Sequence, residues 1–108
     1  MSWPNHLTRL SSEHYRHFMA KASLFWILRK MGHDVASEWR VPNGYADLCD
    51  KTTRTIYEIE LSPKKKYRNR KIAQYRVTGY EVIVVDCSKM SGDIGELKEF
   101  LEEYVIPD

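Results

Sequence analysis

Three carboxylates occupy positions where two predicted strands would bring them together. Glu58 and Glu60 fall on one face of the strand predicted for residues 55–61, with their side chains about 7 Å apart, because side chains alternate between faces. Asp47 belongs to the strand predicted just before it. If residues 51–54 form the turn of a hairpin, Asp47 lies about level with Glu58.

Carboxylate oxygens are hard ligands, and three of them on one face of a sheet suit Mg²⁺ or Mn²⁺. Such an ion lowers the pKa of a bound water and stabilises charge on a phosphate. The alternative is that Glu58 and Glu60 form the solvated face of an edge strand. The opposed Asp47 and the basic segment that follows the strand favour the metal site.

The charge of the chain is unevenly distributed. The net charge is +2, but residues 64–76 carry seven basic side chains and no acidic one. The rest of the chain has ten basic against 15 acidic residues, a net of −5. A mildly acidic body with one basic element indicates a polyanionic partner, or alternatively a solvated helix face.

The size and composition predict one globular domain, residues 1–108. Hydrophobic residues make up 43% and charged residues 30%, which argues against disorder. No apolar run approaches the roughly 20 residues of a membrane span, and the first residues lack the order of a secretory signal. Cys49 and Cys87 match no zinc motif. A disulfide between them is possible from the sequence, but we expect two buried thiols in a reducing, cytoplasmic compartment.

The predicted order of elements is α-β-β-β-α-β-α, a compact α/β sandwich. The first helix should span about residues 13–31, with Ser11 or Ser12 as its N-cap and Gly32 just after its end. Its apolar side chains near one face are Phe18, Ala22, Phe25, Trp26 and Met31. The later elements are strands at 34–41, 45–50, 55–61 and 80–86, a basic helix at 64–78, and a last helix with apolar positions at Ile94, Leu97, Leu101, Tyr104 and Val105.

Residues 43–48 (Asn-Gly-Tyr-Ala-Asp-Leu), followed ten residues later by Glu58-Ile59-Glu60, resemble the PD-(D/E)xK motif of the restriction-endonuclease-like superfamily. The element order resembles its αβββαβ core, including a Gly-Tyr pair (Gly79-Tyr80) before the last strand. Small archaeal Holliday-junction resolvases have a similar size and layout. The resemblance covers roughly residues 13–86. It implies a mixed sheet flanked by helices, here with an added C-terminal helix, and a metal-dependent endonuclease that hydrolyses phosphodiester bonds of branched or structured DNA.

The resemblance also implies roles for individual residues. Asp47 is similar to the central metal ligand and Glu58 to the second carboxylate, and the backbone carbonyl of Ile59 would be a further ligand. Glu13 resembles the extra acidic residue that binds a second metal or orients water. Glu60 would act as general base or second-metal ligand. The metal would be Mg²⁺ or Mn²⁺, and the product would carry a 5′-phosphate.

Two positions depart from the family pattern. Ala46 stands in place of proline, which changes little, and Glu60 stands where a lysine is expected. Three interpretations stay open: Glu60 and the metal activate water, a lysine reaches in from elsewhere, or the fold binds DNA without cleaving it. The candidate lysines are Lys64, Lys21 and Lys51.

The basic helix is the expected DNA contact, through phosphates rather than bases. A small chain with one active site facing a two-stranded duplex further predicts a homodimer. His14 and His17 share a helix face, but without a third ligand in sequence we expect solvated or partly buried histidines. The predicted phosphate-binding residues are Lys64, Lys65, Lys66, Arg68, Arg70 and Lys71.

Overall fold

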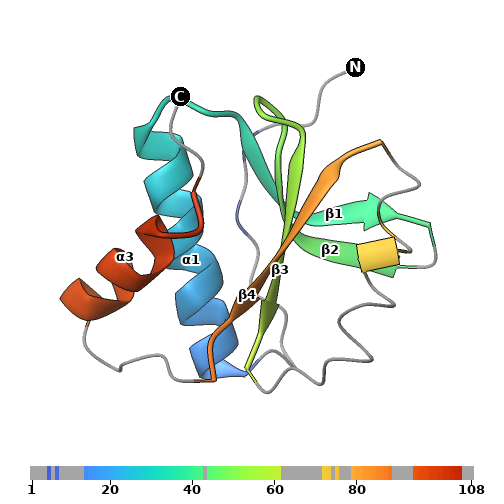
Figure 1. Ribbon diagram of the computed structural model, residues 1–108. Helices are drawn as coiled ribbons and strands as arrows, with labels where there is room; N and C mark the ends of the chain where they lie inside the picture. Colours follow the sequence, from blue (N-terminus) through green and yellow to red (C-terminus); the bar gives the residue numbers. More distant parts are fainter. Residues whose placement is uncertain are drawn as a thin grey trace.

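The chain folds as an α/β structure with a four-stranded mixed sheet and two helices on one of its faces (Figure 1). The structure, a computed structural model, describes residues 5, 7, 14–42, 44–61, 72, 73, 75, 79–88 and 94–105, with the side chains of 94 and 95 excepted. The elements are α1 (Tyr15–Lys30), β1 (Val35–Val41), β2 (Gly44–Asp50), β3 (Thr55–Glu60), β4 (Glu81–Asp86) and α3 (Ile94–Glu102).

The sheet has the order β1-β2-β3-β4, so β2 and β3 are its inner strands. The first three strands are antiparallel neighbours, and β4 is parallel to β3. The predicted hairpin is confirmed, because Asp50 pairs with Thr55 on either side of the turn. The parallel pair of β3 and β4 requires the chain to cross between the two ends of the sheet, as the sequence order predicted.

One face of the sheet carries the main core. Tyr57 and Ile59 point toward α1 and α3, where they pack with Leu24, Leu28 and Leu101. The opposite face has its own apolar cluster, in which Val41, Ala46, Cys49, Ile56 and Val82 pack with Tyr75. The two faces of β3 therefore alternate as the sequence predicted, with Tyr57 and Ile59 opposite Ile56.

The predicted apolar face of α1 is rotated from the one observed. The buried residues of α1 are Ala20, Lys21, Leu24, Ile27 and Leu28. Trp26, predicted on the buried side, is 49% exposed, because it lies about 140° around the helix from Lys21. The orientation could not be predicted from the sequence, because the uninterrupted apolar run after Ser23 gives the helix two faces of similar hydrophobicity.

The ends of α1 show one wrong prediction and one correct one. The N-cap is His14, not Ser11 or Ser12: its Nδ1 accepts a hydrogen bond of 3.1 Å from the backbone N–H of Arg16. An unprotonated imidazole nitrogen replaces the hydroxyl oxygen expected at an N-cap. At the other end, Gly32 follows the helix with φ +87°, and the next N–H bonds back to the Leu28 carbonyl.

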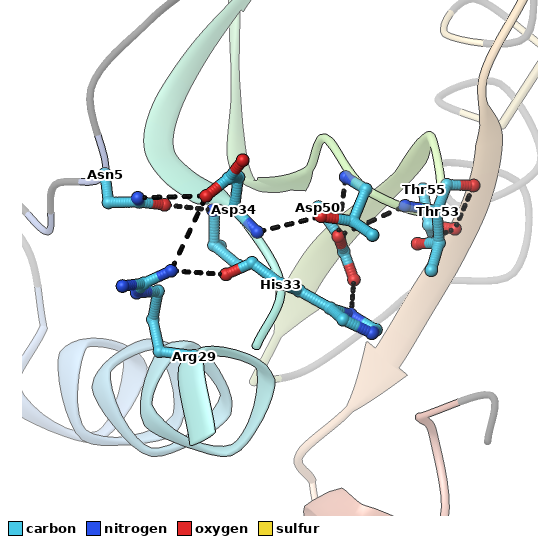
Figure 2. A network of polar contacts seen from close by, with 9 residues as sticks. Asn5, Arg29, His33, Asp34, Asp50, Thr53 and Thr55 are labelled. Atoms are coloured by element: carbon cyan, nitrogen blue, oxygen red, sulfur yellow. Dashed lines mark hydrogen bonds and ion pairs between the residues drawn. The ribbon is translucent and has the colours of Figure 1, made fainter. Parts of the chain in front are cut away.

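A buried polar network ties the end of α1 to the β2–β3 turn (Figure 2). His33 Nδ1 lies 2.6 Å from Asp50 Oδ2, and both side chains are buried. Asp50 Oδ1 accepts the backbone N–H groups of Thr52 and Thr53, at 3.0 and 3.3 Å. The edge strand β1 is covered at its start by Asn5, whose Oδ1 accepts the N–H of Val35 at 2.6 Å.

Two predicted elements lie partly outside the described residues. Of the basic helix expected at 64–78, only Ile72, Ala73 and Tyr75 are described, and all three are helical. The last helix spans Ile94–Glu102, so it carries the predicted positions Ile94, Leu97 and Leu101, whereas Tyr104 and Val105 lie beyond its end. Residues 91–93, expected to open it, lie outside the described residues. In the described part of the chain, no helix has the length and apolarity needed to span a membrane.

Candidate metal and phosphodiester site

Strands β2 and β3 separate beyond Leu48 and Tyr57. Their ladder covers three residue pairs and stops there, although β2 extends back to Gly44 and β3 on to Glu60. Figure 1 shows the start of β2 turning away with β1, while β3 continues alongside β4. The first residues past the last pair are Asp47 on β2 and Glu58 on β3.

Asp47 and Glu58 hold the separated strands together with their side chains. The backbone N–H of Asp47 donates to Glu58 Oε1 at 3.1 Å, and the N–H of Ile59 donates to Asp47 Oδ2 at 2.7 Å. Each carboxylate thus accepts a hydrogen bond from a backbone N–H group that has no partner in the β2–β3 ladder. Both side chains are fixed at the point of divergence, level with each other as the sequence predicted.

Glu58 is a buried residue, 3% exposed, on an inner strand. The alternative of a solvated edge-strand face is therefore wrong for Glu58. Glu60, two residues on, is half-buried, and Ile59 between them is buried in the main core. Burial of a carboxylate is costly unless hydrogen bonds or charges compensate it, and the N–H of Asp47 that donates to Glu58 Oε1 offsets part of this cost.

His17 reaches Asp47 from helix α1. Its Nε2 lies 3.2 Å from Asp47 Oδ2, and the two side chains are 21% and 16% exposed. This pair is partly open to solvent. His17 was expected to be solvated or partly buried; it is partly buried, and its partner is the central predicted ligand.

Lys21 lies one helical turn after His17 and is completely buried. Its Nζ is 2.7 Å from Glu38 Oε1 on β1 and 5.6 Å from the centre of the Phe18 ring. Glu38 lies level with Asp47 across the β1–β2 ladder, between the pairs Ser37↔Leu48 and Trp39↔Ala46. The helix therefore places an imidazole and an ammonium group on the part of the sheet that carries Asp47.

Glu38 has a backbone conformation that few residues other than glycine adopt, with φ +53°. This costs about 1–2 kcal/mol for a residue with a Cβ atom. The kink breaks the alternation of β1: Val35 packs in the main core, whereas Trp39 and Val41 pack on the opposite face. Sequence reasoning missed Glu38 as a site residue, because regular alternation gives no signal for such a kink.

The negative charge of Asp47 also reaches Cys87, just after β4. The pKa of the Cys87 thiol is raised from 9.0 to about 11, first by burial and then by the charges of Asp86 and Asp47, against the opposing effect of Arg16. The pKa of Cys49, which lies on the other face of the sheet, is raised to about 12, mainly by burial. Both cysteines are free and buried, as predicted.

Some predicted site residues lie outside the described part of the chain. These are Glu13 and the six basic residues Lys64, Lys65, Lys66, Arg68, Arg70 and Lys71. Lys51 lies in the β2–β3 turn, at the other end of the paired segment from Asp47.

The predicted convergence of Asp47, Glu58 and Glu60 is formed only in part. Among the described residues, no group of three or more His, Cys, Asp and Glu side chains is arranged to hold a metal ion. Asp47 and Glu58 are brought together, and His17 joins Asp47 from the helix.

No family model matches this chain, and no curated protein or solved structure matches it at a significant level. The resemblance to the restriction-endonuclease-like superfamily therefore stays a prediction from the sequence.

Proposed function

We propose that the protein is a metal-dependent DNA endonuclease of the PD-(D/E)xK type, with its active site where β2 and β3 separate. The observation that carries this proposal is the reciprocal bonding of Asp47 and Glu58. Two carboxylates, one of them buried, are fixed side by side at a break in the sheet. A protein that needed only a sheet would be more stable with a continued ladder there.

The residues around Asp47 have the donor chemistry that a divalent cation requires. Asp47 and Glu58 supply carboxylate oxygens, and the carbonyl of Ile59 follows on the same strand. These residues would hold Mg²⁺ or Mn²⁺. When bound, such an ion lowers the pKa of a water molecule and stabilises charge on a phosphate.

The chain's own residues supply the remaining groups. Glu60, half-buried after Ile59, accepts a proton from the attacking water as a general base. Lys21 takes the place of the lysine missing from β3, because its buried ammonium group lies on the helix face that also carries His17. The Glu38 carboxylate, 2.7 Å away, offsets part of this charge, so Lys21 acts on a phosphate as one member of an ion pair.

The proposal is tested by incubating nicked, branched and linear DNA with the protein and Mg²⁺ or Mn²⁺. Wild type is expected to cleave at least one of these substrates and to leave a 5′-phosphate. Asp47→Asn is the matched variant, because its amide oxygen still accepts the N–H of Ile59 while the negative charge is lost. If both proteins are equally inert on every substrate, the enzyme proposal is wrong.

The alternative is a nuclease fold that binds DNA without cleaving it. The glutamate at position 60 favours this alternative, since the family pattern has lysine there. It predicts salt-dependent DNA binding that is unchanged in Glu58→Gln and is accompanied by no cleavage. A homodimer is part of either proposal, because duplex DNA presents two strands. Sedimentation of the protein with and without duplex DNA tests the stoichiometry.

A further inference from the structure

The hairpin of β1 and β2 carries an arginine and a tyrosine opposite each other. Arg40 on β1 pairs with Tyr45 on β2 in the ladder. Both side chains point to the helix side of the sheet, because their neighbours Val41 and Ala46 pack in the apolar cluster on the opposite face. Asp47 lies on the same side, since a side chain of α1 contacts it. The hairpin therefore presents both residues on the side of the proposed active site.

Both side chains are open to solvent. Figure 1 shows the second half of β1 and the start of β2 extending away from α1 and α3, and Tyr45 is 61% exposed. Arg40 is exposed as well. Within the described ranges, no hydrogen bond or ion pair involves either side chain, whereas the guanidinium of Arg54 lies over the Tyr80 ring. The guanidinium of Arg40 is thus available to an external anion, and the ring of Tyr45 to an external apolar surface.

The surface at this end of the hairpin is hollowed. The hollow has a volume of about 450 Å³ and combines a cation, an aromatic ring and apolar carbon, with no acidic lining residue. These are the groups that bind single-stranded nucleic acid, where a base stacks on an aromatic ring and a cation neutralises a phosphate. The lining residues are Arg40, Val41, Pro42, Gly44 and Tyr45.

The spacing along β2 relates this hollow to the proposed site of cleavage. Tyr45 precedes Asp47 by two residues, so their side chains lie about 7 Å apart along the strand. A stacked nucleic-acid strand advances about 3.4 Å per nucleotide. A base on Tyr45 would therefore belong to a nucleotide about two steps from a phosphate at Asp47. An acidic peptide would fit the cation, but it would not explain an aromatic ring at nucleotide spacing from the carboxylates.

We propose that Tyr45 stacks on an unpaired base and Arg40 binds the adjoining phosphate, so that the site selects DNA with unpaired nucleotides about two steps from the cleaved bond. This rests on the proposed function, which supplies the DNA and the cleaved phosphate. A fully paired duplex offers the same phosphates but stacks its bases on one another, so it gains only the contact with Arg40. Tyr45 thereby sets the preference for unpaired DNA, and Arg40 adds affinity for either form.

The experiment compares two DNA probes without metal, so that neither is cleaved: a duplex with a short single-stranded gap, and the same duplex fully paired. By fluorescence anisotropy, wild type is expected to bind the gapped probe about tenfold tighter. Tyr45→Ala should lose this preference, and Tyr45→Phe should keep it, because the ring remains. Tyr15→Ala is the matched control, since Tyr15 is a similarly exposed tyrosine, at 64%, on α1. Arg40→Gln should weaken binding of both probes and lower the salt dependence by about one phosphate contact.

A second readout detects stacking directly. The fluorescence of 2-aminopurine placed in the gap should be quenched by saturating wild type, Tyr45→Phe and Tyr15→Ala, and much less by Tyr45→Ala. An unchanged preference and unchanged quenching in Tyr45→Ala would overturn the role of Tyr45; cleavage that is lost in Asp47→Asn would then leave the proposed function standing. If wild type binds neither probe at low salt, the proposed function and the role of Tyr45 are both overturned.

Discussion

Lys21 and Glu38 form a close ion pair between α1 and β1: Nζ lies 2.7 Å from Oε1, and the lysine side chain has no exposed surface. The pair exists because Glu38 adopts φ +53°, which turns its side chain to the helix side of the sheet. Burying an ammonium group and bending the strand both cost free energy. Such costs are typical of residues kept for function rather than stability.

Replacing Lys21 tests its contribution to cleavage separately from its contribution to stability. Lys21→Met should lower cleavage about a hundredfold, since it removes a positive charge near the proposed site. It should also destabilise the fold by about 2–4 kcal/mol, because Glu38 loses its partner. Cleavage is measured on the best DNA substrate, and stability by urea unfolding.

The double variant Lys21→Met with Glu38→Gln is the critical comparison. It should recover most of the lost stability, because no partly buried charge is left unpaired, but it should not recover cleavage. Lys30→Met serves as the control, since Lys30 lies on the same helix with its Nζ 4.7 Å from the exposed Trp26 ring. Recovery of cleavage in the double variant would show that Lys21 is purely structural.

The acidic pair allows a test of metal binding that leaves the fold intact. In Glu58→Gln, an amide oxygen still accepts the N–H of Asp47, so the free energy of unfolding without metal should change by about 1 kcal/mol or less. Mn²⁺ should raise the thermal unfolding midpoint of wild type but not of Glu58→Gln, because only a ligand bound to the native state stabilises it. Equal shifts in both proteins would exclude Glu58 as a ligand.

The sequence predicts this part of the site because hairpin register and strand alternation are local rules. The turn at residues 51–54 sets Asp47 level with Glu58, and alternation separates Tyr57 from Glu58. The bonds between the two strands follow from these two rules, once the ladder is interrupted.

Other features depend on tertiary contacts that no local pattern encodes. The kink at Glu38 and the orientation of α1, which leaves Trp26 exposed and Lys21 buried, are set by how the helix packs on the sheet. The N-cap at His14 was missed because histidine is not a preferred cap residue, although its Nδ1 accepts the same hydrogen bond. The contact of His17 with Asp47 was not predicted either, because it depends on how α1 packs on the sheet.

The sealed pair of His33 and Asp50 should be important for stability. His33→Ala leaves a buried carboxylate without one partner, and Asp50→Ala also removes the acceptor of two turn N–H groups. We expect losses of about 3 kcal/mol for His33→Ala and more for Asp50→Ala. Asp34→Ala, at an exposed position in the same network, should cost about 1 kcal/mol or less. Urea unfolding measures all three, and similar losses at positions 34 and 50 would contradict this assignment.

The two thiols predict a loss of stability at alkaline pH. Burial raises the pKa of Cys49 to about 12 and that of Cys87 to about 11, from 9.0. Below about pH 9 both thiols are protonated in the folded and in the unfolded chain, so they do not change the free energy of unfolding with pH. As pH rises through the range from 9 toward the folded values, the unfolded chain releases protons that the native state retains, and unfolding becomes more favourable.

This effect is measured by urea unfolding at a series of pH values from about 8 to about 10.5. The free energy of unfolding should fall more steeply with pH in wild type than in the variant with Cys49→Ala and Cys87→Ala. The variant is expected to be less stable at pH 8, because smaller side chains leave cavities in the core. Parallel pH profiles would show that the thiols do not contribute to the alkaline loss.

Arg54 allows the cost of a left-handed residue to be measured apart from its side chain. It has φ +56° in the β2–β3 turn, its carbonyl accepts the N–H of Glu81 at 3.0 Å, and its guanidinium lies 4.6 Å from the centre of the Tyr80 ring. Arg54→Ala and Arg54→Gly both lose the ring contact, but only alanine keeps a Cβ atom. The glycine variant should therefore be more stable than the alanine variant by about 1 kcal/mol.

Lys51, in the same turn with an ordinary backbone, should show the opposite order, since glycine there adds only chain entropy to the unfolded state. Urea unfolding of the four variants decides the matter: the same order at both positions would mean that the backbone at Arg54 is not strained.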